Sequence, residues 1–278
     1  MALSPDASRL ALVIGSLTAG AEIWVKDLDL GTTSPLVSGR SSARPVWMRD
    51  GATVAYLAAQ SPAGSRDGSR FRLERRSVDR AAPAPSLGAA FATGTFGEFA
   101  ISPDEQFVAI RLSTPNGRDI VYRDIAGDSL VPFATESAQE RSPRFSPDGR
   151  WLVYASDRTG RDEVYIESFP EGGNRVQVSL DGGREPTWSR DGSRIFYRAL
   201  DGWMTAVRLG PGSSLVPTAR ERLFDASGYL SNQYLTMYDV SPDGRFLMLQ
   251  LDPRPEQTEL VIIRNWVQQV KARFAARK

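Results

Sequence analysis

Six aspartates that recur in one sequence context are the first residues of this chain whose types and spacing could do chemistry. They are Asp6, Asp50, Asp104, Asp148, Asp191 and Asp243. A set of carboxylates could bind calcium or supply the acids and bases of a catalytic site. Each aspartate, however, is the third residue of a Ser-Pro-Asp-Gly-like turn, where its side chain hydrogen-bonds the backbone of that turn. We therefore interpret all six as turn-stabilising residues.

A second set of carboxylates, Asp157, Asp162 and Glu163, brackets a predicted hairpin loop. Oxygen-rich loops of this kind can bind calcium, but the regular Asp-x-Asp-x-Asp spacing of an EF-hand loop is absent here. The sequence also contains no cysteine, so neither a disulfide framework nor a thiolate metal site can form. We expect no metal ion, no cofactor and no catalytic residue.

The composition excludes further kinds of chemistry. The 278 residues include no histidine, which removes the commonest general base and transition-metal ligand. The 34 basic and 33 acidic residues nearly cancel, and so the charge does not indicate a nucleic acid as a partner. No apolar run approaches the ~20 residues of a membrane-spanning helix. We expect no nucleic-acid binding, no membrane insertion by this chain, and a monomer.

The elements that position these residues form a repeat. The segment Phe145 to Tyr154 predicts a strand, a tight turn and a second strand. Successive turn aspartates lie 44, 54, 44, 43 and 52 residues apart, and periods of about 40 to 50 residues are typical of propeller blades. We predict an all-β, six-bladed β-propeller over residues 1–264. A short C-terminal helix over 265–278 should follow, because Trp266, Val270 and Phe274 recur at helical spacing.

Four charged residues, Arg44, Glu98, Arg141 and Glu185, precede the predicted inner strands of four successive repeats. The predicted fold would place them near one mouth of the central channel, where propellers commonly bind partners. We therefore choose them as the candidate partner-binding residues. The alternative is a solvated ring of mutually compensating charges. Three tryptophans at strand positions are instead interpreted as core between blades. They are Trp47, Trp151 and Trp188.

The repeat resembles the WD-like, TolB-like propeller repeat of bacteria. The residues that carry this resemblance are Phe145 to Gly149, Asp181 to Gly183 and Pro186 to Gly192. More narrowly, Ser156 to Ile166, Phe169-Pro170 and Val261 to Trp266 look like the C-terminal propeller of bacterial serine/threonine protein kinases. The kinase signatures themselves are absent from the sequence. The resemblance therefore implies the sensor or interaction part of a signalling protein. Propellers of this type also resemble the non-catalytic half of prolyl-oligopeptidase-like peptidases, whose hydrolase half needs a Gly-x-Ser-x-Gly elbow and a histidine, both absent here.

Two functions from different classes are open at this point. The first is a non-catalytic sensor or scaffold module that binds a protein or peptide at the channel mouth. The second is a propeller-type enzyme, a lyase or glycosidase that uses paired carboxylates in the channel. Two acidic side chains facing each other across the channel at about 5 to 10 Å, with perturbed pKa values, would favour the enzyme. We favour binding.

The two ends of the chain add one expectation. Only Met1, Ala2 and Leu3 precede the first turn, and the sixth repeat passes from its third predicted strand, Leu260 to Arg264, into the predicted helix. One outer strand is therefore unaccounted for. We expect either that the helix covers the edge of the sixth blade or that a strand lies upstream of Met1. In the second case the chain is a fragment, extracytoplasmic if it is the tail of a membrane-anchored kinase; a chain that stands alone as given would be cytoplasmic.

Overall fold

The computed structural model describes residues 1–16, 20–39, 41–60, 71–79, 86–88, 96–114, 117–210, 215–233 and 235–250. Every regular element within these ranges is a β-strand, which confirms the predicted all-β fold. Among the same residues, no helix has the length and apolarity to cross a membrane. The predicted strand Leu260 to Arg264 and the predicted helix over 265–278 lie outside the described residues.

The described strands form six antiparallel sheets. The first sheet contains β1 (Ala2–Leu3), β2 (Arg9–Ser16), β3 (Gly20–Asp27) and β4 (Thr33–Val37). The second contains β5 (Ser42–Trp47), β6 (Thr53–Ala59) and β7 (Phe71–Ser77). The third contains β8 (Phe96–Ile101), β9 (Phe107–Thr114), β10 (Gly117–Asp124) and β11 (Val131–Ala134).

The remaining three sheets follow the same order. The fourth contains β12 (Arg141–Phe145), β13 (Trp151–Ser156), β14 (Glu163–Ser168) and β15 (Val176–Gln177). The fifth contains β16 (Arg184–Trp188), β17 (Arg194–Arg198), β18 (Trp203–Leu209) and β19 (Pro217–Asp225). The sixth contains β20 (Tyr238–Val240) and β21 (Phe246–Met248). Within each sheet the strands pair in chain order, as in a β-meander.

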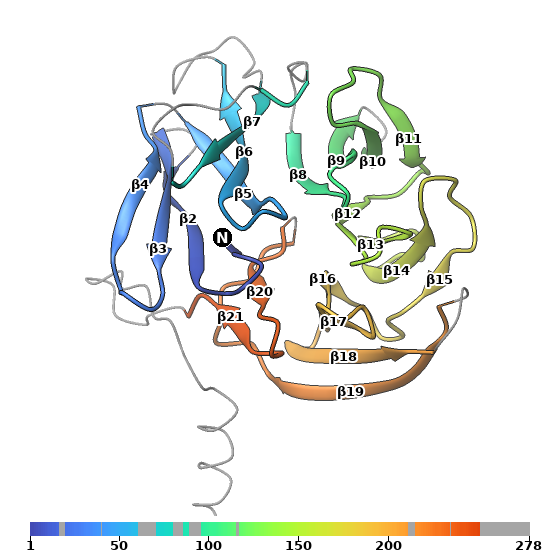
Figure 1. Ribbon diagram of the computed structural model, residues 1–278. Helices are drawn as coiled ribbons and strands as arrows, with labels where there is room; N and C mark the ends of the chain where they lie inside the picture. Colours follow the sequence, from blue (N-terminus) through green and yellow to red (C-terminus); the bar gives the residue numbers. More distant parts are fainter. Residues whose placement is uncertain are drawn as a thin grey trace, which may run out of the picture.

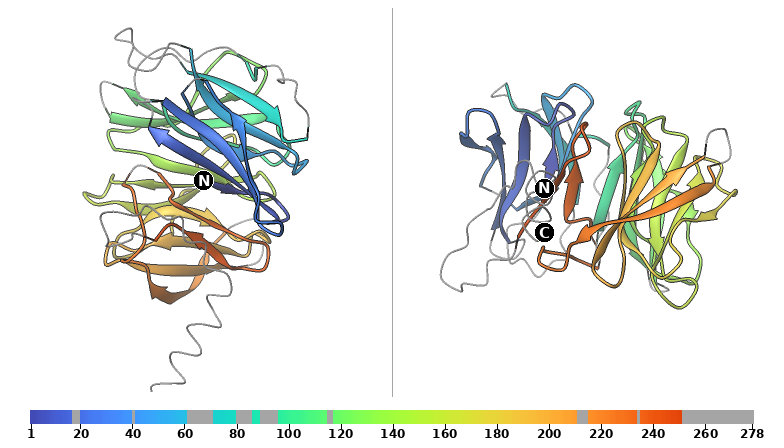
Figure 2. Two further views of the ribbon diagram at one scale, coloured as in Figure 1. Left: turned by 90° about the vertical axis from the view of Figure 1, so that its left-hand side faces the viewer. Right: turned by 90° about the horizontal axis from the view of Figure 1, so that it is seen from below.

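The sheets stand around a common centre as a ring (Figure 1). The first strand of each sheet, such as β8 or β12, is the innermost, and the last, such as β11 or β19, is the outermost. The first and sixth sheets lie side by side (Figure 2). Their contact consists of a hydrogen bond from the Leu3 N–H to Asp239 Oδ2 at 2.9 Å and of Leu10, Leu12 and Leu247 packed around Leu3. The two ends of the strand series therefore meet.

The turns between first and second strands form as predicted. Ser146 Oγ donates to Asp148 Oδ1 at 2.6 Å, while the N–H groups of Arg150 and Trp151 donate to Asp148 and Ser146 at 3.1 and 3.0 Å. Gly149 has a φ of 73°, which favours glycine at this position. The same serine–aspartate bond occurs in four other repeats. These bonds confirm the turn-stabilising interpretation of the aspartates.

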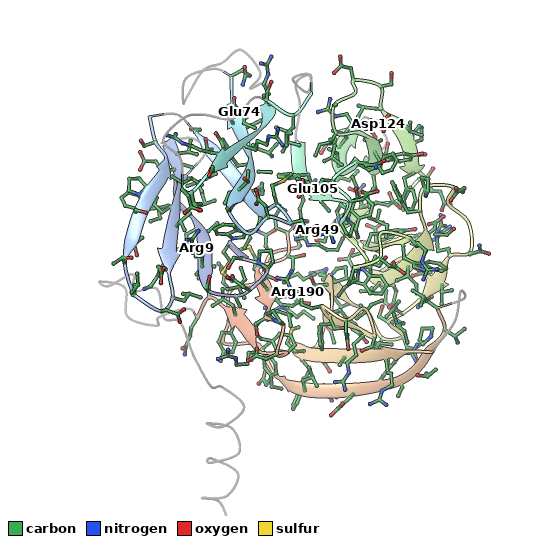
Figure 3. All side chains as sticks on the ribbon, in the orientation of Figure 1. Arg9, Arg49, Glu74, Glu105, Asp124 and Arg190 are labelled. Carbon is green, nitrogen blue, oxygen red and sulfur yellow. The ribbon has the colours of Figure 1, made fainter. Side chains whose placement is uncertain are left out.

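Neighbouring turns also contact one another around the ring. Arg49 and Glu105, on the turns of the second and third repeats, lie next to each other near the centre (Figure 3), and Glu105 Oε1 accepts the Arg49 N–H at 2.7 Å. In the same view Arg190 lies between β16 and β20, where its Nε donates to the Val240 carbonyl at 3.3 Å. At this end of the ring, which we name the turn end, hydrogen bonds thus connect neighbouring repeats.

Apolar side chains fill the space between neighbouring sheets. Trp151 and Trp188 belong to one cluster, in which Val153, Val164 and Ile195 are fully buried. Trp188 Nε1 also donates to the Arg144 carbonyl of the preceding sheet at 3.2 Å. In the same way Trp47 packs between the first and second sheets and donates to the Ala2 carbonyl at 2.9 Å. The interpretation of these tryptophans as core between blades is confirmed.

Candidate functional site

The innermost strands are interrupted by β-bulges near their first residues. The register of pairing shifts in β5, β8, β12 and β16. In three of these bulges the residue before a proline has positive φ: 58° at Arg44, 52° at Ser142 and 54° at Glu185. Such backbone is strained for residues other than glycine, and bulges are frequently placed beside functional sites. We name this end of the ring, opposite the turns, the bulge end.

The prediction that the four candidate residues precede the inner strands is wrong in detail. Arg44, Glu98, Arg141 and Glu185 lie within β5, β8, β12 and β16. The sequence reasoning began these inner strands too late, since they start at Ser42, Phe96, Arg141 and Arg184. Proline within an inner strand marks a bulge, and Pro45, Pro143 and Pro186 are the signal that could have located the bulges of β5, β12 and β16; β8 contains no proline.

Glu98 connects three sheets through its carboxylate. The side chain is almost completely buried, and Arg144 Nη2 of the fourth sheet donates to Oε1 at 2.5 Å. The backbone N–H of Thr236, which precedes β20 in the sixth sheet, donates to the same oxygen at 3.4 Å. Glu98, in the third sheet, therefore binds a side chain of the fourth sheet and a backbone N–H of the segment that leads into the sixth.

Glu185 occupies the equivalent position in the fifth sheet and is also buried. Its Oε1 accepts Arg198 Nε at 3.2 Å and the Asn232 N–H at 3.4 Å, and its Oε2 accepts the Met237 N–H at 2.8 Å. Burial raises the pKa of Glu185, whereas the bond from Met237 and the charge of Arg198 act in the opposite direction. The adjacent residues Thr236 and Met237 thus bind the two carboxylates from one strip of backbone.

Arg141 belongs to a separate network between the fourth and fifth sheets. Its guanidinium donates to Asp162 and, at 3.3 Å, to Asp157 Oδ2, and Asp162 also accepts Arg184. The carboxylates considered for calcium are therefore occupied by arginines. Glu163 likewise accepts Ser179 Oγ and the Gly182 N–H. In the part of the chain that the structure describes, no group of three or more metal-ligating side chains (His, Cys, Asp or Glu) is arranged to hold a metal ion.

Arg44 is half-buried and binds the neighbouring sheet through one bond, from its Nε to the Gly97 carbonyl at 3.1 Å. Burial lowers the pKa of Arg44, and Glu98 opposes this effect. The structure thus brings Arg44 close to Glu98, while Arg141 and Glu185 lie in the next two sheets. The four predicted residues share one end of the ring but not one contact network.

A cleft lies at the bulge end beside Glu185. Its volume is about 150 Å³, and its lining includes Arg184, Glu185 and Arg198 from the fifth sheet. The opposite wall comes from the segment that follows β19, including Asn232 and Gln233. The cleft combines charged groups held in fixed positions with exposed polar groups on a connecting segment. This arrangement suits the recognition of a polar chain.

Two buried arginines were missed by the sequence reasoning. Arg111 and Arg198 each stand nine residues after a turn serine, in β9 and β17. Both are over nine-tenths buried, at 6% and 7% exposure. A charged residue at a position that is apolar in three of the other four repeats (Val13, Leu57 and Ala155, but Gln250 in the sixth) was the available signal, since buried arginines are rare unless they are paired.

The sequence is similar over part of its length to a curated protein, and its fold is similar to that of solved structures. No protein-family model matches the sequence. A 97-residue stretch is 35% identical to an uncharacterized peptidase, YuxL, of Bacillus subtilis (strain 168), covering 34% of this chain and 13% of that protein. The chain therefore spans only a small part of this relative.

Among solved structures, TolB from Acinetobacter baumannii has a TM-score of 0.66 at 17% identity, with 88% of this chain and 62% of that chain covered. The periplasmic gluconolactonase PpgL from Pseudomonas aeruginosa has a TM-score of 0.59 at 18% identity, with 92% and 83% covered. The chain is TolB-like and a β-propeller in fold. Since one neighbour is an enzyme by its title, the fold by itself does not decide the function.

Proposed function

We propose that this chain is a non-catalytic propeller module that binds a protein or peptide at the bulge end, as a monomer. The observation that carries the proposal is the cleft of about 150 Å³ beside Glu185. Its charged wall is held in position by Arg198 and by the Met237 N–H. Charges fixed before a partner arrives favour affinity, because little side-chain ordering remains to be done on binding.

The alternative is a lyase or glycosidase that uses paired carboxylates. Such an enzyme needs one carboxyl group that can deliver a proton and another that can act as base or nucleophile. Glu98 and Glu185 are the two carboxylates of the candidate residues at the bulge end that do not belong to an arginine–aspartate network, and each accepts an arginine and a backbone N–H. These bonds favour the ionised form, but burial still raises the pKa of Glu185, and Glu98 Oε2 has no partner among the described residues. The bonds from arginines and backbone N–H groups to both carboxylates support a structural role for Glu98 and Glu185, and for this reason we favour binding over catalysis.

The proposal includes a ring of six blades. It is supported by the six described sheets and by the contact of Leu3 with Asp239 between the first and the sixth. Membership of a kinase-type signalling protein is also part of it. This rests on the resemblance of Ser156 to Ile166 and Val261 to Trp266, of which the second stretch lies outside the described residues. Sequencing the gene upstream of Met1 tests this last point: a kinase domain in frame supports it, and an unrelated domain contradicts it.

Peptides selected from a random display library on the immobilised chain provide the test of binding. Leu200 lines the cleft and is 44% exposed, whereas Val216 is 55% exposed and is not among the residues that line it. Leu200→Glu should weaken the selected peptides at least tenfold, while the matched Val216→Glu variant should bind as wild type does. Equal binding by both variants would contradict a site at the cleft. Arg141 is unsuitable for this test because its guanidinium holds Asp157 and Asp162.

A further inference from the structure

Among the described residues, Arg111 is a buried cation without a hydrogen-bond acceptor. It is 6% exposed, its Nε is completely buried without an acceptor, and it has no hydrogen bond or ion pair with the described residues. A buried charge of this kind is costly unless it is paired and hydrogen-bonded. The guanidinium therefore has unused capacity for an acceptor.

The fifth sheet shows what the same position does when it is satisfied. Arg198 is the repeat-equivalent of Arg111, and it donates to Glu185 Oε1 at 3.2 Å, to the Ala226 carbonyl at 2.7 Å and to the Leu230 carbonyl at 3.3 Å. One carboxylate and two peptide carbonyls thus complete its bonding. These are the groups that a peptide with an acidic residue carries.

In the third sheet the equivalent carboxylate is used elsewhere. Glu98 and Glu185 each stand four residues before their turn serine, but Glu98 Oε1 accepts Arg144 and the Thr236 N–H, and its Oε2 has no partner among the described residues, the arginine of its own sheet included. Arg111 therefore lacks the partner that Arg198 has. The third sheet therefore differs from the fifth in that the N–H donors of its arginine remain available to an acceptor.

Gly97 places a second arginine beside the first. The Arg111 guanidinium lies against Gly97 in the space that a Cβ would occupy, so that only glycine leaves room for it. Arg44 donates to the carbonyl of the same glycine. Burial lowers the pKa of Arg111 to about 10, Glu98 opposes this, and the positive charges of Arg118, Arg44 and Arg141 lower it further. Three arginines and one carboxylate, that of Glu98, thus act on the charge of Arg111.

We propose that Arg111 and Arg44, on the two sides of Gly97, form a binding site for a peptide carboxylate, from an acidic side chain or a C-terminus. The inference rests on the proposed function and names the partner chemistry: an acidic peptide. A carboxylate matches the partner that Arg198 has in the fifth sheet. It also has the planar pair of oxygens that a guanidinium can bind through two N–H groups.

Three short peptides and inorganic phosphate serve as probes. The first is acetyl-Gly-Asp-Gly-amide, the second its Asn counterpart, and the third acetyl-Gly-Gly with a free C-terminus. Binding is followed by NMR through the arginine Nε–H signals of the labelled chain. We expect saturable shifts with at least one of the two peptides that carry a carboxylate. Comparing the Asp peptide with the free C-terminus shows whether the site prefers a side-chain or a terminal carboxylate. The Asn peptide should bind at least tenfold more weakly.

The variants decide whether the arginine is responsible. Arg111→Gln should lose at least tenfold in affinity for the carboxylate peptides, whereas Arg208→Gln, at an exposed position of β18, should bind as wild type does. Arg44→Gln should weaken binding too, and it provides the test if Arg111→Gln does not fold. Equal affinity in the arginine variants, tighter binding of phosphate, or no binding of any carboxylate would overturn the inference. If library-selected peptides still bind the cleft in that case, the proposed function stands without it.

Discussion

Glu140 offers the sharpest prediction of pH-dependent stability. The residue directly before β12 is 2% exposed, Ser156 Oγ donates to its Oε1 at 3.0 Å, and its Oε2 has no partner in the described structure. Burial raises the pKa of Glu140 to about 7, the bond from Ser156 opposes this, and the charges of Asp119 and Glu136 add to it. The folded protein therefore favours the protonated carboxyl group.

The size of the effect follows from the difference in pKa between folded and unfolded chain. The ordinary value is 4.5 and the folded value about 7, and one pKa unit corresponds to ~1.4 kcal/mol. Since the folded pKa is raised, the stabilising contribution is complete below about pH 4.5 and is lost as the pH rises through about 7. Glu140→Gln keeps a neutral side chain at every pH. The variant should thus match wild type near pH 4 and exceed it by on the order of 2–3 kcal/mol near pH 8.

Urea unfolding at several pH values between 4 and 8 measures this difference directly. Glu171→Gln, at an exposed position, is the matched control and should track wild type throughout. The carboxylates of the turns titrate equally in all three proteins and cancel in the comparison. A stability difference that does not change with pH, or a Glu140→Gln variant less stable than wild type near pH 8, would refute the reasoning.

Three further predictions concern stability. Asp148→Ala should lower the free energy of unfolding by on the order of 1 kcal/mol, because its turn hydrogen bonds are lost; an unchanged urea midpoint would contradict this. Arg198→Gln should lower the free energy of unfolding by about 3 kcal/mol because it leaves Glu185 buried without its cation. Arg111→Gln, by contrast, should not lower the melting temperature. Equal losses of stability in both variants would show that Arg111 is paired. Hydrogen bonds from Ser4 and then from the Ser8 backbone lower the pKa of Asp6 to about 2, so its contribution is present above about pH 4 and is lost as the pH falls through about 2. Asp6→Asn should accordingly reduce the acid sensitivity seen in thermal melts, and an unchanged acid profile would contradict the assignment.

The sequence predicted the parts of the fold that depend on local chemistry. The turn at Ser146 to Gly149 forms because its serine and aspartate bond within a few residues, and such short-range patterns are legible in a sequence. The core position of Trp188 was predictable for the same reason, as an aromatic residue directly before a turn. The repeat interval then sufficed to predict radially arranged sheets.

The candidate site was less predictable because its contacts are long-range. Glu98 and Thr236 are 138 residues apart, and Glu185 and Met237 are 52 apart; no local pattern connects them. The repeat also hides the difference between Arg111 and Arg198. Both occupy the same position of their repeats, but within the described structure only Arg198 has acceptors, the Glu185 carboxylate and the carbonyls of Ala226 and Leu230.

The central claim is that a peptide or protein binds at the bulge end, and backbone NMR of the labelled chain with a library-selected peptide tests it most directly. Glycine N–H groups report on both ends: Gly97 and Gly202 lie at the bulge end, and Gly51, Gly149 and Gly192 at the turn end. We predict that the selected peptide shifts the signals of Gly97 or Gly202, together with those of Asn232 and Met237 beside Glu185. Shifts confined to Gly51, Gly149 and Gly192 would place the binding surface at the opposite end and contradict the account.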